Sequence, residues 1–222
     1  MSDPDLGPLH IVVRCHPEQE SFNASMATAY CAGVRQHGHR AFVRDLYSIG
    51  FDPVLKSVER PGMGRDFRQM PDVLDELAII REAVVFVLIY PIWFGGPPAM
   101  LKGYVERVLG TGAMPLQLPQ EIATGVLMHK RLVSFSSSAT DAQWLATQGQ
   151  LDALISGFDR YIEHGFAMKP SQHIHFGSIS TGMDTQLIEQ HLQEVKAKAR
   201  LICQNLDQEA AVAEVARLAG RK

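Results

Sequence analysis

The chain has 222 residues, 46% of them hydrophobic, which suffices for one sizeable core and is too short for two ordinary domains joined by a linker. Its 21 basic and 24 acidic residues give a formal net charge of -3, and neither sign forms the long run that would follow nucleic acid or an anionic bilayer. No apolar stretch approaches the roughly 20 residues of a membrane span, and residues 1–8 lack the pattern of a secretory signal. We therefore expect one cytoplasmic domain over 1–222, with a core over 9–206 and a tail over 207–222, that acts on small molecules rather than nucleic acid and is not inserted in a membrane.

Short β-branched runs alternate along the chain with segments whose apolar residues recur at helical spacing. In chain order the patterns predict a strand at Leu9–Cys15, a helix from Phe22 that ends at Gly38, a strand at Arg40–Leu46, an irregular excursion over Tyr47–Met70, a helix at Asp72–Ala83, a strand at Val84–Tyr90, a helix opening at Pro98, a strand at Arg131–Phe135, a helix at Asp141–His164, a strand at Ser171–Ile179 and a charged helix at Thr185–Gln208. The unbroken apolar run VVFVLIY at 84–90 indicates a central parallel strand that is covered on both faces.

Five strands alternating with five helices predict a three-layer α/β/α sandwich, because right-handed crossovers place helices on both faces of a parallel sheet. For a five-stranded chain of this length we expect the strand order 2-1-3-4-5. Ligands of such sheets bind beyond the carboxyl ends of the strands, where the winding direction changes. Three loops rich in aromatic, hydroxyl and turn residues follow the first, third and fourth strands, at His16–Asn23, Pro91–Pro97 and Ser136–Asp141. We expect them to meet at one site.

The first two loops suit different parts of one ligand. Ser21, Phe22 and Asn23 open a helix whose free N–H groups attract a phosphate, unless Ser21 is only a helix cap and His16 a surface residue. In the second loop, Trp93 and a neighbouring Phe stand beside two glycines, which favours a planar heterocycle over the alternative that both rings are ordinary core or interface residues.

The serine-rich third loop offers hydroxyl and backbone donors for the polar edge of a ring, or else is a plain connection. Other chemistries lack their motifs, since neither the GxSxG elbow of hydrolases nor the GxxxxGK(S/T) phosphate loop occurs. Cys15, Cys31 and Cys203 are far apart and are expected to be buried apolar residues. His173 and His175 share a strand face without an acidic or cysteine partner nearby, so no metal site is predicted.

Three stretches, HPEQESFN, GHRAFVRDLYSIGFDPVL and YPIWFGGPPAMLKGYVERVL, resemble the flavodoxin-like NAD(P)H:quinone oxidoreductase family, which includes bacterial modulators of drug activity and ancillary proteins of potassium efflux systems. The resemblance runs with gaps from Leu9 to Gly112. It implies that His16, Ser21, Phe22 and Asn23 contact the ribityl and phosphate of a flavin, and that Pro91, Ile92, Trp93 and Phe94 cradle its ring.

The resemblance also marks departures from the family. Ser136, Ser137, Ser138 and Ala139 stand where relatives carry a Thr-Thr-Gly-Gly loop, which implies flavin contacts with a different backbone approach. Trp144 and Gln150 lie near the positions of a Tyr and a His in active relatives. Trp144 and Ser138 are therefore weak catalytic candidates.

What the resemblance implies for activity is a homodimeric enzyme with its active site at the subunit interface. NAD(P)H would reduce bound FMN or FAD, and a quinone or similar acceptor would reoxidise it in a ping-pong cycle. The excursion at Lys56–Met70 and the aromatic loop are candidates for the dimer contact. The alternative is a regulatory flavoprotein subunit of a membrane transporter such as a potassium efflux system.

Overall fold

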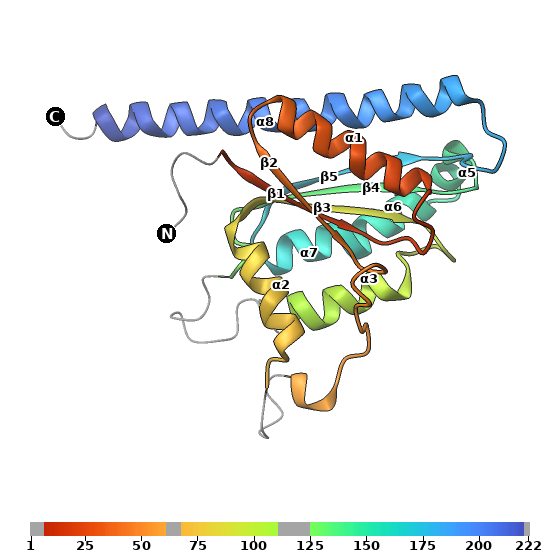
Figure 1. Cartoon of the computed structure of the whole chain (residues 1–222), viewed down its shortest axis with the longest axis horizontal. Helices are drawn as coiled ribbons and strands as arrows, with labels where there is room; N and C mark the ends of the chain where they lie inside the picture. The colour runs from red at the N-terminus through yellow and green to blue at the C-terminus, as the bar shows by residue number, and fades with distance from the viewer. Residues whose placement is uncertain (1–6, 61–67, 111–124, 220–222) are drawn as a thin grey trace.

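The computed structural model describes residues 7–60, 68–110 and 125–219. Five parallel strands form one sheet in the order β2-β1-β3-β4-β5, with helices on both faces (Figure 1). This order and the three-layer architecture confirm the prediction. The strands are β1 Leu9–Arg14, β2 Arg40–Asp45, β3 Ala83–Pro91, β4 Arg131–Ser137 and β5 Lys169–Phe176.

Two helices cover one face of the sheet, and the other helical segments cover its opposite face and its carboxyl edge (Figure 1). On the first face lie α1 Phe22–Gln36 and α8 Thr185–Ala219. The remaining segments are a 3-10 turn at Ser57–Glu59, α2 Pro71–Glu82, α3 Ala99–Tyr104 with a π-helical turn at Val105–Leu109, α5 Ala142–Thr147, α6 Gln150–Leu154, a π-helical turn at Ile155–Asp159 and α7 Arg160–Gly165.

The central strand β3 supplies both cores. Phe86, Leu88 and Tyr90 pack into the core beneath α2 and α3, whereas the alternate residues Val87 and Ile89 pack against α1 and α8. This double burial explains the unbroken apolar run and confirms that the strand is central.

Two long helical predictions need correction. The segment 141–164 is not one helix, because Gly149 adopts φ +69° and separates α5 from α6. Helix α8 does not end near Gln208 but continues to Ala219, through a stretch of strong helix formers without Gly or Pro. The predicted tail over 207–222 is therefore helical as far as 219.

The close packing of α1 on α8 depends on Gly33. A Cβ atom at this position would lie 2.7 Å from the Lys196 carbonyl oxygen and 2.9 Å from the Ala199 Cβ atom. Only glycine permits this approach without moving one helix. The contact therefore sets how closely α1 and α8 pack.

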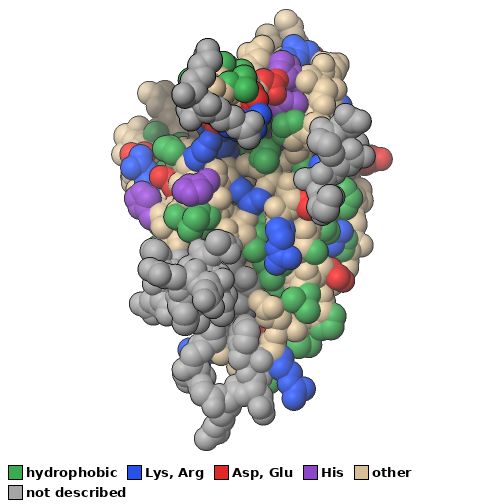
Figure 2. Space-filling view, turned by 90° about the vertical axis from the view of Figure 1, so that its left-hand side faces the viewer, with side chains coloured by type: hydrophobic (Ala, Val, Ile, Leu, Met, Phe, Trp, Pro, Cys, Tyr) green, Lys and Arg blue, Asp and Glu red, His purple; other side chains and the backbone are tan. Residues whose placement is uncertain are grey.

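The surface carries charges of both signs. Figure 2 faces the end of the molecule from which α8 projects, and basic, acidic and apolar side chains are interspersed on this face. Among the described residues, no helix combines the length and apolar character needed to cross a bilayer.

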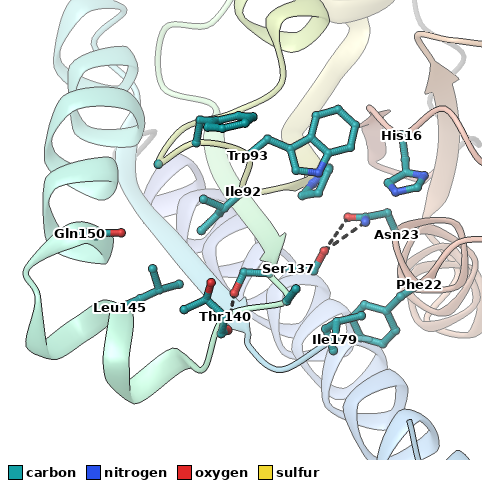
Figure 3. A pocket seen from close by; sticks show the side chains of 15 residues that line it. His16, Phe22, Asn23, Ile92, Trp93, Ser137, Thr140, Leu145, Gln150 and Ile179 are labelled. Atoms are coloured by element: carbon teal, nitrogen blue, oxygen red, sulfur yellow. Dashed lines mark hydrogen bonds between the residues drawn. The ribbon is translucent and has the colours of Figure 1, made fainter. Parts of the chain in front are cut away.

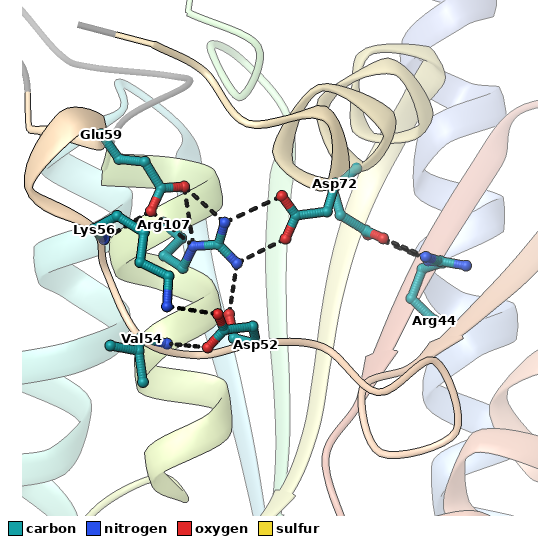
Figure 4. A network of polar contacts seen from close by, with 8 residues as sticks. Arg44, Asp52, Val54, Lys56, Glu59, Asp72 and Arg107 are labelled. Atoms are coloured by element: carbon teal, nitrogen blue, oxygen red, sulfur yellow. Dashed lines mark hydrogen bonds and ion pairs between the residues drawn. The ribbon is translucent and has the colours of Figure 1, made fainter.

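The excursion after β2 is anchored by Arg107, whose side chain is 2% exposed (Figure 4). Its Nη2 donates to Glu59 Oε1 at 2.7 Å, and its Nη1 donates to Asp72 Oδ2 at 2.7 Å and to the Asp52 carbonyl at 2.6 Å. Glu59 is fully buried. The predicted dimer segment Lys56–Met70 begins and ends in this region, but its residues 61–67 lie outside the described part of the chain.

Replacing Arg107 by Met would leave the buried Glu59 carboxylate without its cationic partner, although its Oε2 would still accept from the Lys56 N–H. We expect the free energy of unfolding, measured by urea denaturation, to fall by about 3–5 kcal/mol. Lys102→Met is the matched control, since the Lys102–Glu106 ion pair is exposed and its loss should cost about 0.5 kcal/mol. A loss below about 1 kcal/mol for Arg107→Met would contradict the anchoring role.

Candidate functional site

A cavity of about 640 Å³ opens at the carboxyl ends of β1, β3 and β4 (Figure 3). This volume lies within the range of about 300–1,000 Å³ that is typical of small-molecule pockets. The three loops that follow these strands do meet there. The cavity is lined by His16, Phe22, Asn23, Pro91, Ile92, Trp93, Phe94, Gly95, Ser137, Ser138, Ala139, Thr140, Leu145, Gln150 and Ile179.

The structure brings together every predicted cofactor residue except two. Ser21 does not line the cavity, because it caps α1 and its Oγ accepts a hydrogen bond from the Ala24 N–H at 3.2 Å. Ser136 is fully buried behind the wall. Of the other candidates, Trp144 is half-exposed on α5 outside the lining, whereas Gln150 lines the cavity.

One wall is formed by the loop after β1 and the first turn of α1. The Nδ1 atom of His16 accepts a hydrogen bond from the Glu18 N–H at 3.0 Å. Burial lowers the pKa of His16, so its ring is neutral near pH 7 and carries its hydrogen on Nε2. The ring lies 5.9 Å from that of Trp93, centroid to centroid. His16 therefore presents a donor at the rim of the pocket.

The adjoining wall is a hairpin at 93–96 with a two-residue turn. Trp93 and Gly96 exchange both backbone hydrogen bonds, at 2.9 and 3.1 Å. Phe94 and Gly95 at the tip have φ of +50° and +80°, as a type I′ turn requires. Phe94 is a non-glycine residue in this left-handed region, and its side chain is fully exposed. The turn thus holds an aromatic side chain in solvent at the mouth of the cavity.

The floor joins segments that are remote in sequence. Asn23 Nδ2 donates to Ser137 Oγ at 3.1 Å, which links α1 to the end of β4. The Ile92 N–H donates to the Ser137 carbonyl at 2.7 Å and links the loop after β3 to the same strand. Asn23 is 2% exposed, so its amide is held in place beneath any ligand.

A buried line of polar side chains reaches this floor from the sheet. We call it the Ser–His network, and its members are Ser134, Ser136, Ser138, Asp159, His173 and His175. In its outer half, Ser138 Oγ donates to the Thr140 carbonyl at 2.6 Å and lies 3.1 Å from His175 Nε2. His175 Nδ1 lies 2.8 Å from Ser136 Oγ.

The inner half ends on a carboxylate. Ser136 Oγ lies 2.7 Å from His173 Nε2, and His173 Nδ1 lies 2.7 Å from Asp159 Oδ2. Ser134 donates to the other oxygen of Asp159. The side chains of His173 and Asp159 are 2% and 0% exposed. The expectation that no acidic partner stands near His173 is therefore wrong, because the π-helical turn at 155–159 directs Asp159 onto β5.

Two directions of hydrogen bonding satisfy the network. In the first direction, Ser138 donates to the Thr140 carbonyl, and His175 Nε2 donates to Ser138 Oγ. Ser136 then donates to His175 Nδ1, and His173 Nε2 donates to Ser136 Oγ. The pair of His173 and Asp159 then retains one further proton between them. In the second, the three hydroxyl–imidazole bonds are reversed, Ser138 no longer donates to the Thr140 carbonyl, which still accepts from the Ser178 N–H, and the pair has one proton fewer. Passing between the two delivers a proton at Ser138 Oγ, in the pocket.

Several functional residues escaped the sequence analysis. Leu145 on α5 and Ile179 after β5 line the cavity although no motif marks them, whereas Gly95 and Thr140 lie in two of the loops that were predicted to meet there. The Ser–His network did have a signal, since serines recur at every second position of 134–138 and histidines at 173 and 175. Alternation on two neighbouring strands indicates one shared face.

Comparisons with known proteins agree with this geometry. The sequence profile of a family described as having a flavodoxin-like fold matches residues 9–199. The chain is 31% identical over 128 residues to an uncharacterized NAD(P)H oxidoreductase of Haemophilus influenzae, covering 57% of this chain and 62% of that protein. It is 29% identical over 139 residues to NAD(P)H dehydrogenase (quinone) 1 of Cavia porcellus, covering 55% and 50%. Both matches span less than two thirds of the relative's length.

Solved structures share the fold. An NAD(P)H:quinone oxidoreductase of Methanothermobacter marburgensis superposes with a TM-score of 0.76 at 23% identity, covering 88% of this chain and 97% of that one. An FMN-dependent NADH-azoreductase of Bacillus anthracis, solved with FMN, gives a TM-score of 0.62 at 14% identity, covering 89% and 100%.

The network also makes stability depend on pH. Burial, and then the charge of His173, lower the pKa of His175 to about 4 from an ordinary value of 6.5. Between these values the unfolded chain binds more protons, so stability should fall as the pH falls from 6.5 to 4. His175→Gln should flatten this dependence in urea midpoints, whereas His164→Gln, at an exposed position, should not. Equal slopes for all three proteins would contradict the assignment.

Proposed function

The chain belongs to the flavodoxin-like fold family, and from that premise we propose that it is an NAD(P)H oxidoreductase that uses FMN or FAD to reduce a quinone or similar small acceptor. The names of its relatives support oxidoreductase activity. The observation that carries the proposal is the convergence of an aromatic hairpin, a helix N-terminus and a hydroxyl-rich loop on one cavity. The relatives named above are oxidoreductases, and their names give no support to the transporter-subunit alternative.

The residues around the cavity suit a flavin. The hairpin at 93–96 offers an indole face, and the N–H groups at its tip are not used by its own bridge. Phe22 and Asn23 open α1, where free backbone N–H groups and the helix dipole favour a phosphate. The Ser21 hydroxyl can still donate its hydrogen to that phosphate while it caps the helix.

A bound flavin would accept hydride from NAD(P)H and pass it to the acceptor in two half-reactions of a ping-pong cycle. The protein's part is to orient the ligands and to manage protons. Ser138 is 7% exposed at the pocket wall, and its Oγ is where the Ser–His network delivers or takes back a proton. Ser138 is therefore our catalytic candidate in place of Trp144, which lies outside the lining. Ser137 and Ala139 complete the wall beside it.

We further propose a homodimer with the active site at its interface. The exposed aromatic side chains of Trp93 and Phe94 stand at the mouth of the cavity, where a second copy would cover them. A cytoplasmic location suits the three buried cysteines, none of which is paired.

The first test is an absorption spectrum of the purified protein, as isolated and after addition of FMN or FAD. We expect a flavin band that bleaches with anaerobic NADPH or NADH and returns when a quinone is added. Release of the bound flavin, followed by chromatography, then identifies it as FMN or FAD. A colourless protein that binds neither flavin would refute the proposal.

A second test removes the proton path at the pocket wall. Ser138→Ala should lower kcat by about 10²-fold, the smaller end of what proton transfer contributes, with flavin affinity changed by less than about threefold. Ser180→Ala, at an exposed position beyond β5, is the matched control and should leave kcat unchanged. A normal kcat and pH profile for Ser138→Ala would exclude the network from the reaction.

A further inference from the structure

A second cluster of reactive side chains lies at the other end of β1, away from the pocket. His10 comes from β1, His39 from the connection between α1 and β2, and Cys203 from α8. All three are buried, and their ligand-type atoms lie within 4.8 Å of one another. Nothing in the proposed function uses this cluster.

The spacing of these atoms matches a tetrahedral metal. His10 Nε2 lies 3.3 Å from His39 Nδ1, and Cys203 Sγ lies 3.8 Å from His10 Nε2. With Zn–N near 2.0–2.1 Å and Zn–S near 2.3 Å, tetrahedral angles place two nitrogens about 3.3 Å apart and a sulfur about 3.6 Å from a nitrogen. These two separations differ from the expected ones by at most a few tenths of an ångström, and all three ligand-type atoms lie within 4.8 Å of one another. A small adjustment of Cys203 would complete three bonds.

The outer nitrogens of both rings already have the partners that metal-binding histidines need. His39 Nε2 lies 2.9 Å from Asp207 Oδ1, and His10 Nδ1 lies 2.9 Å from the Tyr30 hydroxyl. A carboxylate or hydroxyl on the second nitrogen fixes the tautomer and orients the first nitrogen toward the metal. His37 holds the other oxygen of Asp207 at 3.1 Å. The half-exposed Asp207 marks a short path from solvent.

We propose that His10, His39 and Cys203 bind one Zn²⁺ ion that fastens α8 to the amino-terminal end of the sheet. The mixed nitrogen and thiolate set selects zinc over magnesium or calcium, which prefer oxygen. Three protein ligands leave the fourth position for a water. The proposed zinc site lies where α8 leaves the body of the protein, since Ile202 and Cys203 are the last buried residues of this helix. This proposal gives Cys203 a role as a metal ligand, whereas the sequence indicated only a buried apolar residue and no metal site.

Protons balance on binding. Without metal, Tyr30 donates to His10 Nδ1, His10 donates from Nε2 to His39, and His39 donates to Asp207. With metal, the hydrogen of His10 moves to Nδ1 and is donated to Tyr30, and the Cys203 thiol proton leaves to solvent. One proton is released for each zinc bound, and each imidazole nitrogen of His10 and His39 has a partner in both states.

The test uses the full chain purified without a polyhistidine tag, stripped with a chelator and dialysed against ZnCl₂. We expect about one zinc per chain by elemental analysis, and X-ray absorption should show one sulfur near 2.3 Å with nitrogens near 2.0 Å. Zinc should also raise the thermal midpoint by about 5 °C or more. These readouts do not involve flavin or turnover, so failure here leaves the proposed function intact.

Cys203→Ser tests the sulfur ligand, with Cys31→Ser as the matched control, since Cys31 is also buried between α1 and the sheet but lies outside the cluster. The control should bind zinc as the wild type does, and Cys203→Ser should lose the sulfur signal and the thermal shift. Should Cys203→Ser fail to fold, the X-ray absorption spectrum of the zinc-loaded wild type alone decides whether sulfur is a ligand. Absence of a sulfur shell, or zinc bound equally by Cys203→Ser, would overturn the proposal.

Discussion

The parallel pairing of β4 with β5 is the constraint on which the site depends. Its register sets Ser134 opposite His173 and Ser136 opposite His175. Because successive side chains of a strand point to opposite faces, these hydroxyl and imidazole groups share one face, and Val133 and Phe135 turn to the other core. A shift of one residue would bury the polar groups among apolar ones and break the line to the pocket.

The same alternation links stability to chemistry. A buried carboxylate and imidazole are costly unless each polar atom has a partner, and Asp159 and His173 partner each other and two serines. The line ends at Ser138, the member that reaches the cavity. A network that only satisfied the core would have no reason to end at a ligand site. Its course from Asp159 to the pocket is therefore the strongest structural argument for a role in moving protons.

Much of the fold could be predicted from the sequence because local patterns report burial directly. The apolar run at 84–90 marked the central strand, and the three loops after predicted strands had to meet at one edge. The break at Gly149 could not be predicted, because an isolated glycine is tolerated within a helix. The partner of His173 could not be foreseen either, since the direction of Asp159 depends on a π-helical turn. The cluster of His10, His39 and Cys203 joins three segments whose packing has no local signature.

The most direct test of the account is a crystal structure of the protein grown with its flavin. We expect the ring in the cavity against the hairpin at 93–96, the phosphate at the start of α1 and a polar edge of the ring within hydrogen-bond distance of Ser138 Oγ. A flavin bound in another place, or a ring whose polar edge turns away from Ser138, would contradict the account. The expected structure would place the Ser–His network in contact with the ligand. Either contradicting structure would leave the network as a structural element of the core.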